Sequence, residues 1–328
     1  MAFGTGLTRR QTLATGGAGI IALGLGAKPA LALDTVRQGY QTNMWGMPTY
    51  YLLRSGLLEK HGVKFEEFAV PSGNVTMQQQ VARQVDLGTY AGPSMIIGHD
   101  KGGLIAVAML EYVGKTARVT ARKELGFTSV AQLKGKKVAN QSGSSTGNIF
   151  VDQIAKGAGL NKGDYEEIRM DVNNMVSAIA AKTVDAMVTV EPYNAVAEAE
   201  GLVNTLVDFY SFDKLPVFLC ATPEFVEKSP DTIVAYIKAW MEAAKDVRAN
   251  SPKVLETIGG YYKEKGYAMA PEVLKTALSR VEVQLGWPAD LKPYLQHHAE
   301  VLLAEKKIKA IPDWSKVLRT DFATKAGA

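Results

Sequence analysis

Residues 137–189 read KVANQSGSSTGNIFVDQIAKGAGLNKGDYEEIRMDVNNMVSAIAAKTVDAMVT, in which short apolar runs alternate with longer segments of helical spacing. We expect strands and helices in turn here, over 137–140, 146–158, 168–171, 174–182 and 186–189. Alternation of this kind predicts an open α/β sheet with mostly parallel strands.

The same alternation extends toward the N-terminus, whereas the C-terminal third departs from it. Strands are expected at 35–41, 63–70, 86–90 and 105–112, and helices at 47–60 and 75–84. After residue 222 only helices are expected, at 230–250, 252–266, 271–286 and 288–307. Each of these four segments begins with or near a proline, a residue that suits the first turn of a helix.

This pattern predicts two α/β lobes, because helices confined to one side cannot bury both faces of a sheet. We expect the first lobe at 33–117 and 219–328, with the C-terminal helices packed on it. The second lobe is expected at 118–218. Crossover segments within 114–122 and 213–220 would join the two lobes.

Residues 1–32 have the features of an export signal. Thr8-Arg9-Arg10-Gln11-Thr12-Leu13 is a twin-arginine pattern, a weakly apolar stretch follows it, and Ala30-Leu31-Ala32 is a small-x-small cleavage site. No cysteine follows the cleavage site, so no lipoprotein anchor is expected. We expect a soluble periplasmic protein from which the signal has been removed. An uncleaved amphipathic N-terminal anchor is the alternative.

The charge balance argues against nucleic acid as a partner. The chain has 37 Lys and Arg against 33 Asp and Glu, a net charge of +4. Residues 1–32 contain Arg9, Arg10 and Lys28 and no acidic residue, so the remainder is close to neutral. A near-neutral chain has no electrostatic reason to prefer nucleic acid or anionic lipid.

The residues that usually carry catalysis or bind metals do not form a recognisable pattern. The histidines His61, His99, His297 and His298 lack a metal-ligand spacing, and Cys220 lies in an apolar run typical of a buried thiol. The turn at 143–147 lacks the lysine of a phosphate-binding loop. We therefore expect no enzyme activity, no metal and no cofactor.

Three polar loops follow expected strands and precede expected helices. They are Gln41-Thr42-Asn43-Met44-Trp45-Gly46, Ala91-Gly92-Pro93-Ser94 and Gly143-Ser144-Ser145-Thr146-Gly147. Ligands of open α/β sheets bind in the crevice at the carboxyl ends of the strands, where such loops meet. The third loop either binds an anion through free N–H groups or is simply a helix cap formed by Ser144 or Ser145.

Several stretches carry a resemblance to a known family. They are Gly39-Tyr40-Gln41, RSGLLEKHG at 54–62, VAQLKGKKV at 130–138, GSST at 143–146, AIAAKTVDA at 178–186 and Glu191-Pro192-Tyr193. The chain resembles the solute-binding proteins of ABC importers, in the branch with nitrate-, taurine- and alkanesulfonate-binding proteins. The resemblance implies the two-lobed fold of type II periplasmic binding proteins, with two crossover hinges. It also implies that the lobes close over a solute and that the closed form docks on a membrane permease.

Carried over to this sequence, the resemblance implies one ligand site made by both lobes. Its expected residues are Gln41, Asn43, Met44, Trp45, Pro93, Ser94, Ser142, Ser144, Ser145, Thr146, Asn173, Glu191 and Tyr193. Glu191-Pro192 resembles a Trp-Glu-Pro pattern of the family, but Val190 replaces the tryptophan. Glu191 either meets an amino group of the solute or is held by a backbone turn. Arg118 and Arg122 either clamp the solute or lie on the surface.

The expected solute is a small organic anion, a sulfonate or an aromatic or aliphatic carboxylate. Met44, Trp45, Tyr90 and Tyr193 would give it apolar walls that a bare inorganic anion does not need. The alternatives are a thiamine precursor or another nitrogen-containing solute, or an enzyme of thiamine-precursor synthesis on the same fold. An inner-membrane ABC permease is the expected partner of a monomeric binding protein.

Overall fold

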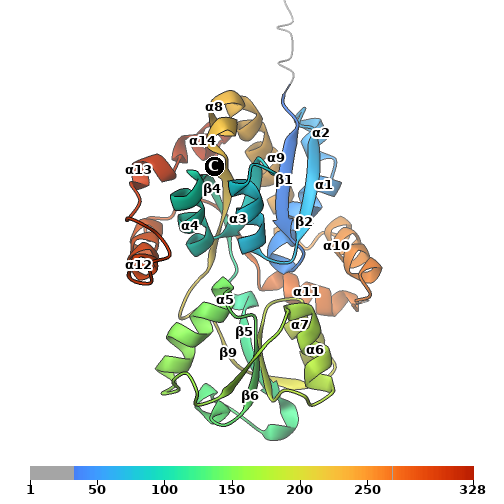
Figure 1. The fold of residues 1–328 in the computed structure, drawn as a ribbon. Coiled ribbons are helices and arrows are strands. Elements are labelled where there is room, and N and C mark those ends of the chain that lie inside the picture. Colours follow the sequence, from blue (N-terminus) through green and yellow to red (C-terminus); the bar gives the residue numbers. More distant parts are fainter. Residues whose placement is uncertain (1–32, 268) are drawn as a thin grey trace, which may run out of the picture. The chain divides into compact units, whose positions relative to one another are not determined.

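The protein contains two β-sheets (Figure 1). The structure is a computed structural model that describes residues 33–267 and 269–328. The expected export signal lies outside the described residues. Within the described ranges, no helix is both long and apolar enough to cross a membrane.

The first sheet has six strands in the order β11-β4-β10-β3-β1-β2. Their bounds are Val36–Gln41 (β1), Phe65–Val70 (β2), Leu87–Ala91 (β3), Ile105–Tyr112 (β4), Pro216–Ala221 (β10) and Glu282–Gly286 (β11). β1 runs parallel to β2 and β3, whereas β10 is antiparallel to both β3 and β4, and β11 is antiparallel to β4.

The second sheet has five strands in the order β7-β6-β8-β5-β9. Their bounds are Arg118–Arg122 (β5), Lys137–Asn140 (β6), Glu166–Arg169 (β7), Ala186–Thr189 (β8) and Val203–Asp208 (β9). β6 is parallel to β7 and β8, and β5 is antiparallel to β8 and β9.

Both sheets are mixed, but most strands of each sheet run in one direction, as predicted; β10 and β11 in the first sheet and β5 in the second run against them. For β5 and β10 the physical reason lies in the two connections between the sheets. The chain leaves β4 and enters β5, and it leaves β9 and enters β10. Parallel neighbours need a crossover helix that brings the chain back to the edge of the sheet where the previous strand began. A strand that enters directly from the other sheet lacks this helix, and it therefore runs antiparallel to its neighbours.

The first lobe consists of the six-stranded sheet and the helices packed on it. These are α1 (Met47–Arg54), α2 (Leu57–Lys60), α3 (Gly73–Val81), α4 (Gly92–Gly102), α8 (Pro223–Lys228), α9 (Pro230–Arg248), α10 (Pro252–Glu264), α11 (Pro271–Ser279), α12 (Leu291–Ala304), α13 (Trp314–Val317) and α14 (Thr320–Ala326). Helix α9 packs against α1, α2 and α14, and α12 lies beside α4 (Figure 1). The C-terminal helices therefore lie on the first lobe.

One predicted helix is partly a strand. The segment expected to be helical over 271–286 is helical only to Ser279, and β11 follows it. Val281, Val283 and Leu285 alternate with more polar residues, which is the period of a strand. The prediction of helices alone after residue 222 missed this alternation.

The second lobe consists of the five-stranded sheet with shorter helices. These are α5 (Ser145–Ile149), which continues as a π-helix over Phe150–Ala155, α6 (Val172–Ala180) and α7 (Tyr193–Ala199). In the first connection a 3₁₀ turn, Gly114–Thr116, lies between β4 and β5. The lobe boundaries at 117/118 and 218/219 stay predictions.

Candidate functional site

A small cavity of about 30 Å³ lies where the polar loops of both lobes meet. The predicted residues that line it are Gln41, Asn43, Trp45, Ser94, Ser144, Ser145 and Thr146. The remaining lining residues are Ser72, Gly73, Asn74, Ala91, Gln141 and Val190. No charged side chain is among them in the described part of the chain, so a bound group would meet only neutral donors and acceptors.

The second lobe contributes the N-terminus of α5 to this cavity. Ser144 is the N-cap: its Oγ accepts from the N–H of Gly147 at 3.0 Å and donates to the carbonyl of Gln141 at 2.7 Å. The N–H groups of Ser145 and Thr146, in the first turn, have no acceptor within the helix. Ser144 therefore acts as a helix cap, while Ser145 and Thr146 present free donors at the positive end of the helix.

Gln41, at the end of β1, is the most deeply buried of the polar residues with which the first lobe lines the small cavity. Its side chain is 1% exposed, and its Oε1 has no hydrogen-bond partner within residues 33–267 and 269–328. A Cβ atom at position 73 would lie 2.5 Å from Gln41 Nε2, so Gly73 leaves the space that the amide occupies. A buried amide oxygen without a partner is costly, which makes Gln41 a strong candidate to bind a ligand.

Asn43 and Trp45 connect the cavity to the first connection between the lobes. Asn43 Oδ1 accepts from the N–H of Trp45 at 3.0 Å, and the Trp45 indole N–H donates to Thr116 Oγ1 at 2.6 Å. The carbonyl of Thr116 in turn accepts from the N–H of Glu191 and from Asn194 Nδ2, both at 3.1 Å. The orientation of the indole is therefore fixed by the segment about which the lobes would hinge.

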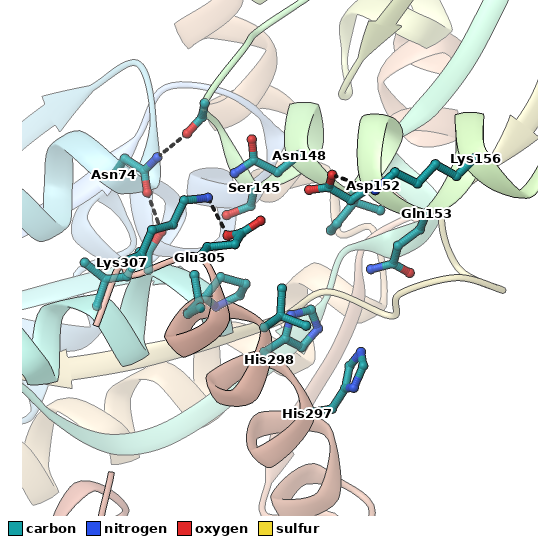
Figure 2. A pocket seen from close by; sticks show the side chains of 17 residues that line it. Asn74, Ser145, Asn148, Asp152, Gln153, Lys156, His297, His298, Glu305 and Lys307 are labelled. Atoms are coloured by element: carbon teal, nitrogen blue, oxygen red, sulfur yellow. Dashed lines mark hydrogen bonds and ion pairs between the residues drawn. The ribbon is translucent and has the colours of Figure 1, made fainter. Parts of the chain in front are cut away.

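Asn74, in the first turn of α3, bridges the two lobes beside the cavity. Its Nδ2 donates to the carbonyl of Gly143 at 3.0 Å, and its Oδ1 accepts from Ser94 Oγ at 2.6 Å (Figure 2). The sequence analysis did not include Asn74. It follows β2 in the stretch Ser72-Gly73-Asn74, so the rule that selected the other loops also applied to it.

Three larger cavities adjoin the small one. The first, of about 440 Å³, lies between α4, α12 and the helical segment that begins with α5, and Pro93 lines it (Figure 2). The second, of about 560 Å³, is lined by Ser142, whose Oγ also donates to Glu167 Oε1 at 2.5 Å. The third, of about 300 Å³, is lined by Asn173 and Tyr193.

Three predicted site or wall residues lie elsewhere. The side chains of Met44 and Tyr90 are fully buried, and the Tyr90 hydroxyl donates to Gln80 Oε1 at 2.6 Å. Glu191 is also fully buried: its Oε2 accepts from the N–H of Ala195 at 3.0 Å, and its Oε1 pairs with Arg280. Burial raises the pKa of Glu191, against the opposing effect of Arg280. Its carboxylate is thus neutralised by an arginine that the sequence analysis did not identify.

Arg118 and Arg122 pair with acidic residues of their own lobe. Arg122 contacts Glu124 and Asp185, each at 2.6 Å, and Arg118 lies 3.5 Å from Glu198. Neither arginine lines any of the four cavities in the described part of the molecule. The arrangement that both would need to clamp a solute is not present.

Comparisons with known proteins agree with this architecture. A binding protein of Brucella abortus is 28% identical over 315 residues, covering 93% of this chain and 97% of its own. A protein of Escherichia coli named as an aliphatic sulfonates-binding protein is 27% identical over 219 residues, or 64% of this chain and 66% of its own.

Among solved structures, the alkanesulfonate-binding protein SsuA from Xanthomonas axonopodis pv. citri, bound to MOPS, superposes with a TM-score of 0.74. It is 19% identical, and the match covers 87% of this chain and 97% of SsuA. The fold is thus that of the two-lobed periplasmic binding proteins. The profile of the NMT1/THI5 like family matches residues 43–253. This match spans more than half of the sequence, and the chain therefore belongs to the NMT1/THI5-like family.

Proposed function

We propose that this protein is the periplasmic solute-binding component of an ABC importer and that it encloses a small organic anion between its lobes. The observation that carries the proposal is the small cavity, which is lined both by the start of α5, with its free N–H groups, and by Gln41, whose amide oxygen has no partner in the described residues. The names of the Brucella and Escherichia coli relatives support the binding role.

The chemistry of the cavity favours an acidic group with several oxygens. A desolvated anion must be hydrogen-bonded, and a helix N-terminus supplies N–H donors together with a favourable dipole. The amides of Gln41 and Asn43 and the hydroxyls of Ser145 and Thr146 add neutral donors. A sulfonate or carboxylate can accept from several of them at once.

The size of the cavity limits what it can hold. A single water molecule needs roughly 10–15 Å³ of cavity volume, measured as the space open to the centre of a water-sized sphere. A cavity of about 30 Å³ therefore accommodates an acidic head group rather than a whole organic molecule. The rest of the solute would extend into one of the adjoining cavities.

Solute binding would be coupled to closure of the lobes. The Asn74–Gly143 hydrogen bond and the Arg280–Glu191 ion pair join elements of the two lobes. A solute that contacts both lobes stabilises this arrangement, and a permease that recognises the same arrangement would select the loaded protein. We propose an inner-membrane permease as the partner, a monomeric binding protein, and export by the twin-arginine signal.

Binding without chemical change is the activity that the site supports. Acid–base or nucleophilic catalysis needs titratable or nucleophilic groups in reach of the substrate. The side chains that line the small cavity in the described residues are amides, serine and threonine hydroxyls, an indole and small apolar groups, with no partner base among them. We propose that the protein is not an enzyme.

A thermal-shift panel on the purified protein, stripped of bound molecules by unfolding and refolding, tests the proposal. The panel contains alkane- and arenesulfonates, carboxylates, nitrate, amino acids and a thiamine-precursor pyrimidine. At a hundredfold excess over its dissociation constant, a true solute stabilises by about 2.7 kcal/mol. A panel in which only nitrogen-containing cations or pyrimidines raise the melting temperature would refute an anionic solute.

Two variants assign the effect to the cavity. Gln41→Leu should abolish the ligand-induced shift without lowering the stability of the free protein, because the amide oxygen accepts no hydrogen bond in the described structure. Gln79→Leu is the matched control: Gln79 also lies in the first lobe with an unpaired Oε1, but it lines none of the cavities described here. It should keep the full shift.

A further inference from the structure

The cavity of about 300 Å³ directly adjoins the small cavity. The two share Asn43 from the first lobe and Gln141 from the second. Its other lining residues include Tyr193, Tyr261, Tyr262 and Tyr267, together with Lys265 and Asp171. A solute whose acidic group occupies the small cavity can therefore extend past Asn43 and Gln141 into a space with aromatic walls.

Four tyrosines form these walls. Tyr261 and Tyr262 lie on α10 with ring centroids 5.2 Å apart and planes at 84°. Tyr193 of α7 and Tyr267, which follows α10, have ring centroids 5.6 Å apart and planes at 79°. In both pairs the edge of one ring meets the face of the other, so the cluster already has the packing that a further aromatic ring can join.

Two of the tyrosine hydroxyls are already engaged with the backbone. The Tyr267 hydroxyl donates to the carbonyl of Asn173, and the Tyr262 hydroxyl donates to the carbonyl of Thr42 at 3.4 Å. These bonds hold the two rings in place in the wall of the cavity. The first of them also connects the first lobe to the start of α6 in the second lobe, so the cavity is built from both lobes.

Tyrosine cages also bind cations, and the charges around this cavity argue against one. Its charged lining residues are Lys265 and Asp171. The Lys265 ammonium already lies over the Tyr261 ring, 5.9 Å from the centroid, where a cationic ligand would gain most. A second cation would be repelled there, whereas an uncharged planar ring meets no such penalty.

The other two adjoining cavities have different walls. The cavity of about 440 Å³ carries two internal ion pairs, Asp152–Lys156 at 3.6 Å and Glu305–Lys307 at 2.8 Å (Figure 2). The cavity of about 560 Å³ is lined by polar and aliphatic residues with Arg169 and Asp171. Among the described residues, neither is lined by a tyrosine, phenylalanine or tryptophan.

We infer that the tyrosine-lined cavity is a subsite for a planar aromatic body, and hence that the solute is an aromatic sulfonate or carboxylate. This inference rests on the proposed function, because it places the acidic group of the same molecule in the small cavity. It selects the aromatic members from the broader class of organic anions.

Isothermal titration calorimetry with a matched set of sulfonates tests the inference. The set consists of methanesulfonate, benzenesulfonate, phenylmethanesulfonate, 2-phenylethanesulfonate and a trimethylammonio-alkanesulfonate. We expect at least one phenyl compound to bind about tenfold or more tightly than methanesulfonate, since burying a ring removes much apolar surface from water. Tyr193→Leu and Tyr261→Leu should each reduce this ratio at least about threefold, and Tyr193→Phe should preserve it.

Phe212→Leu is the control for loss of an aromatic ring, since Phe212 is 41% exposed and lines a separate cavity. The ratio should not change in that variant. Binding of methanesulfonate with equal or weaker binding of every phenyl compound would overturn this inference and leave the proposed function standing. Preference for the ammonio compound would also overturn it. Absence of binding by every sulfonate and by the matching carboxylates would instead contradict the proposed function.

Discussion

Arg280, directly after α11, forms an ion pair with the fully buried carboxylate of Glu191, which precedes α7 in the second lobe. The second guanidinium nitrogen, Nη2, donates to Glu198 Oε2 at 2.7 Å. Helix α11 packs against α7 at this point. One arginine of the first lobe thus pairs with two carboxylates of the second, next to the backbone hydrogen bonds of the first connection.

Loss of this arginine should destabilise the protein in a pH-dependent way. We expect Arg280→Met to lower the free energy of unfolding by about 3 kcal/mol near pH 7, because it leaves a buried carboxylate unpaired. Burial raises the pKa of Glu191 above 4.5, its ordinary value, and Arg280 opposes that effect, so the variant raises the pKa further. A raised carboxyl pKa means that stability is lost as the pH rises above 4.5 toward the folded-state value.

Urea denaturation at about pH 4 and pH 7 checks this prediction. The difference between wild type and Arg280→Met should be smaller at the lower pH. The double variant Arg280→Met with Glu191→Gln should recover part of the loss at neutral pH, because the buried charge is gone. An equal loss at both pH values without recovery would show that the arginine acts through packing alone.

Neighbouring serines at the start of α5 should have separable roles. Ser144→Ala should lower the free energy of unfolding by about 1 kcal/mol, because its Oγ caps the helix at Gly147. Ser145→Ala should leave stability nearly unchanged and weaken solute binding by about 1–3 kcal/mol if Oγ donates to a charged group. Chemical denaturation and calorimetry on both variants measure the two effects, and reversed effects would contradict the assignment.

The order of strands and polar loops was enough to select several residues that line the small cavity. Gln41, Trp45 and Ser145 were selected because they lie at the end of a strand or in the loop that follows it. Asn74 obeys the same rule after β2 but was not considered. Arg280 could not be found in this way, because its partner Glu191 lies 89 residues away and nothing in the local sequence indicates the pairing. The reversed direction of β5 and β10 was missed for a similar reason, since it follows from the connections between the lobes.

The Asn74 bridge should influence how far the lobes close. Asn74→Ala removes the hydrogen bonds to Gly143 and Ser94, which contribute about 1 kcal/mol each between neutral groups. We expect a larger radius of gyration for the free variant in small-angle scattering and an affinity for solute that is weaker by about fivefold or more. The physical reason is that the solute must then supply the part of the closure energy that this bridge provides.

Asn74→Asp separates the two hydrogen bonds of the bridge. A carboxylate can still accept from Ser94 Oγ but cannot donate to the carbonyl of Gly143. If the contact between the lobes is what matters, Asn74→Asp should behave like Asn74→Ala in scattering. If both variants have the same radius of gyration as wild type, the bridge is a consequence of closure and does not contribute to it.

Glu111 gives a second pH-dependent prediction, independent of the site. It lies in β4, opposite Val217 of β10 and Val283 of β11, and is 1% exposed. Its Oε2 has no hydrogen-bond partner in the described residues, and burial raises its pKa well above 4.5. The folded protein therefore holds this proton more tightly than the unfolded chain does.

Stability should consequently fall as the pH rises above 4.5, the ordinary value for this carboxyl, toward its higher folded-state pKa. Glu111→Gln has no ionisable group at this position, so it should remove this part of the pH dependence. Near pH 8 the free energy of unfolding of the variant should exceed that of wild type by about 1 kcal/mol or more. Urea denaturation between about pH 4 and pH 8 measures the difference. Glu256→Gln, at an exposed position of α10, should leave the profile unchanged. A Glu111→Gln profile parallel to that of wild type would mean that the Glu111 carboxyl binds its proton equally well in the folded and unfolded chain.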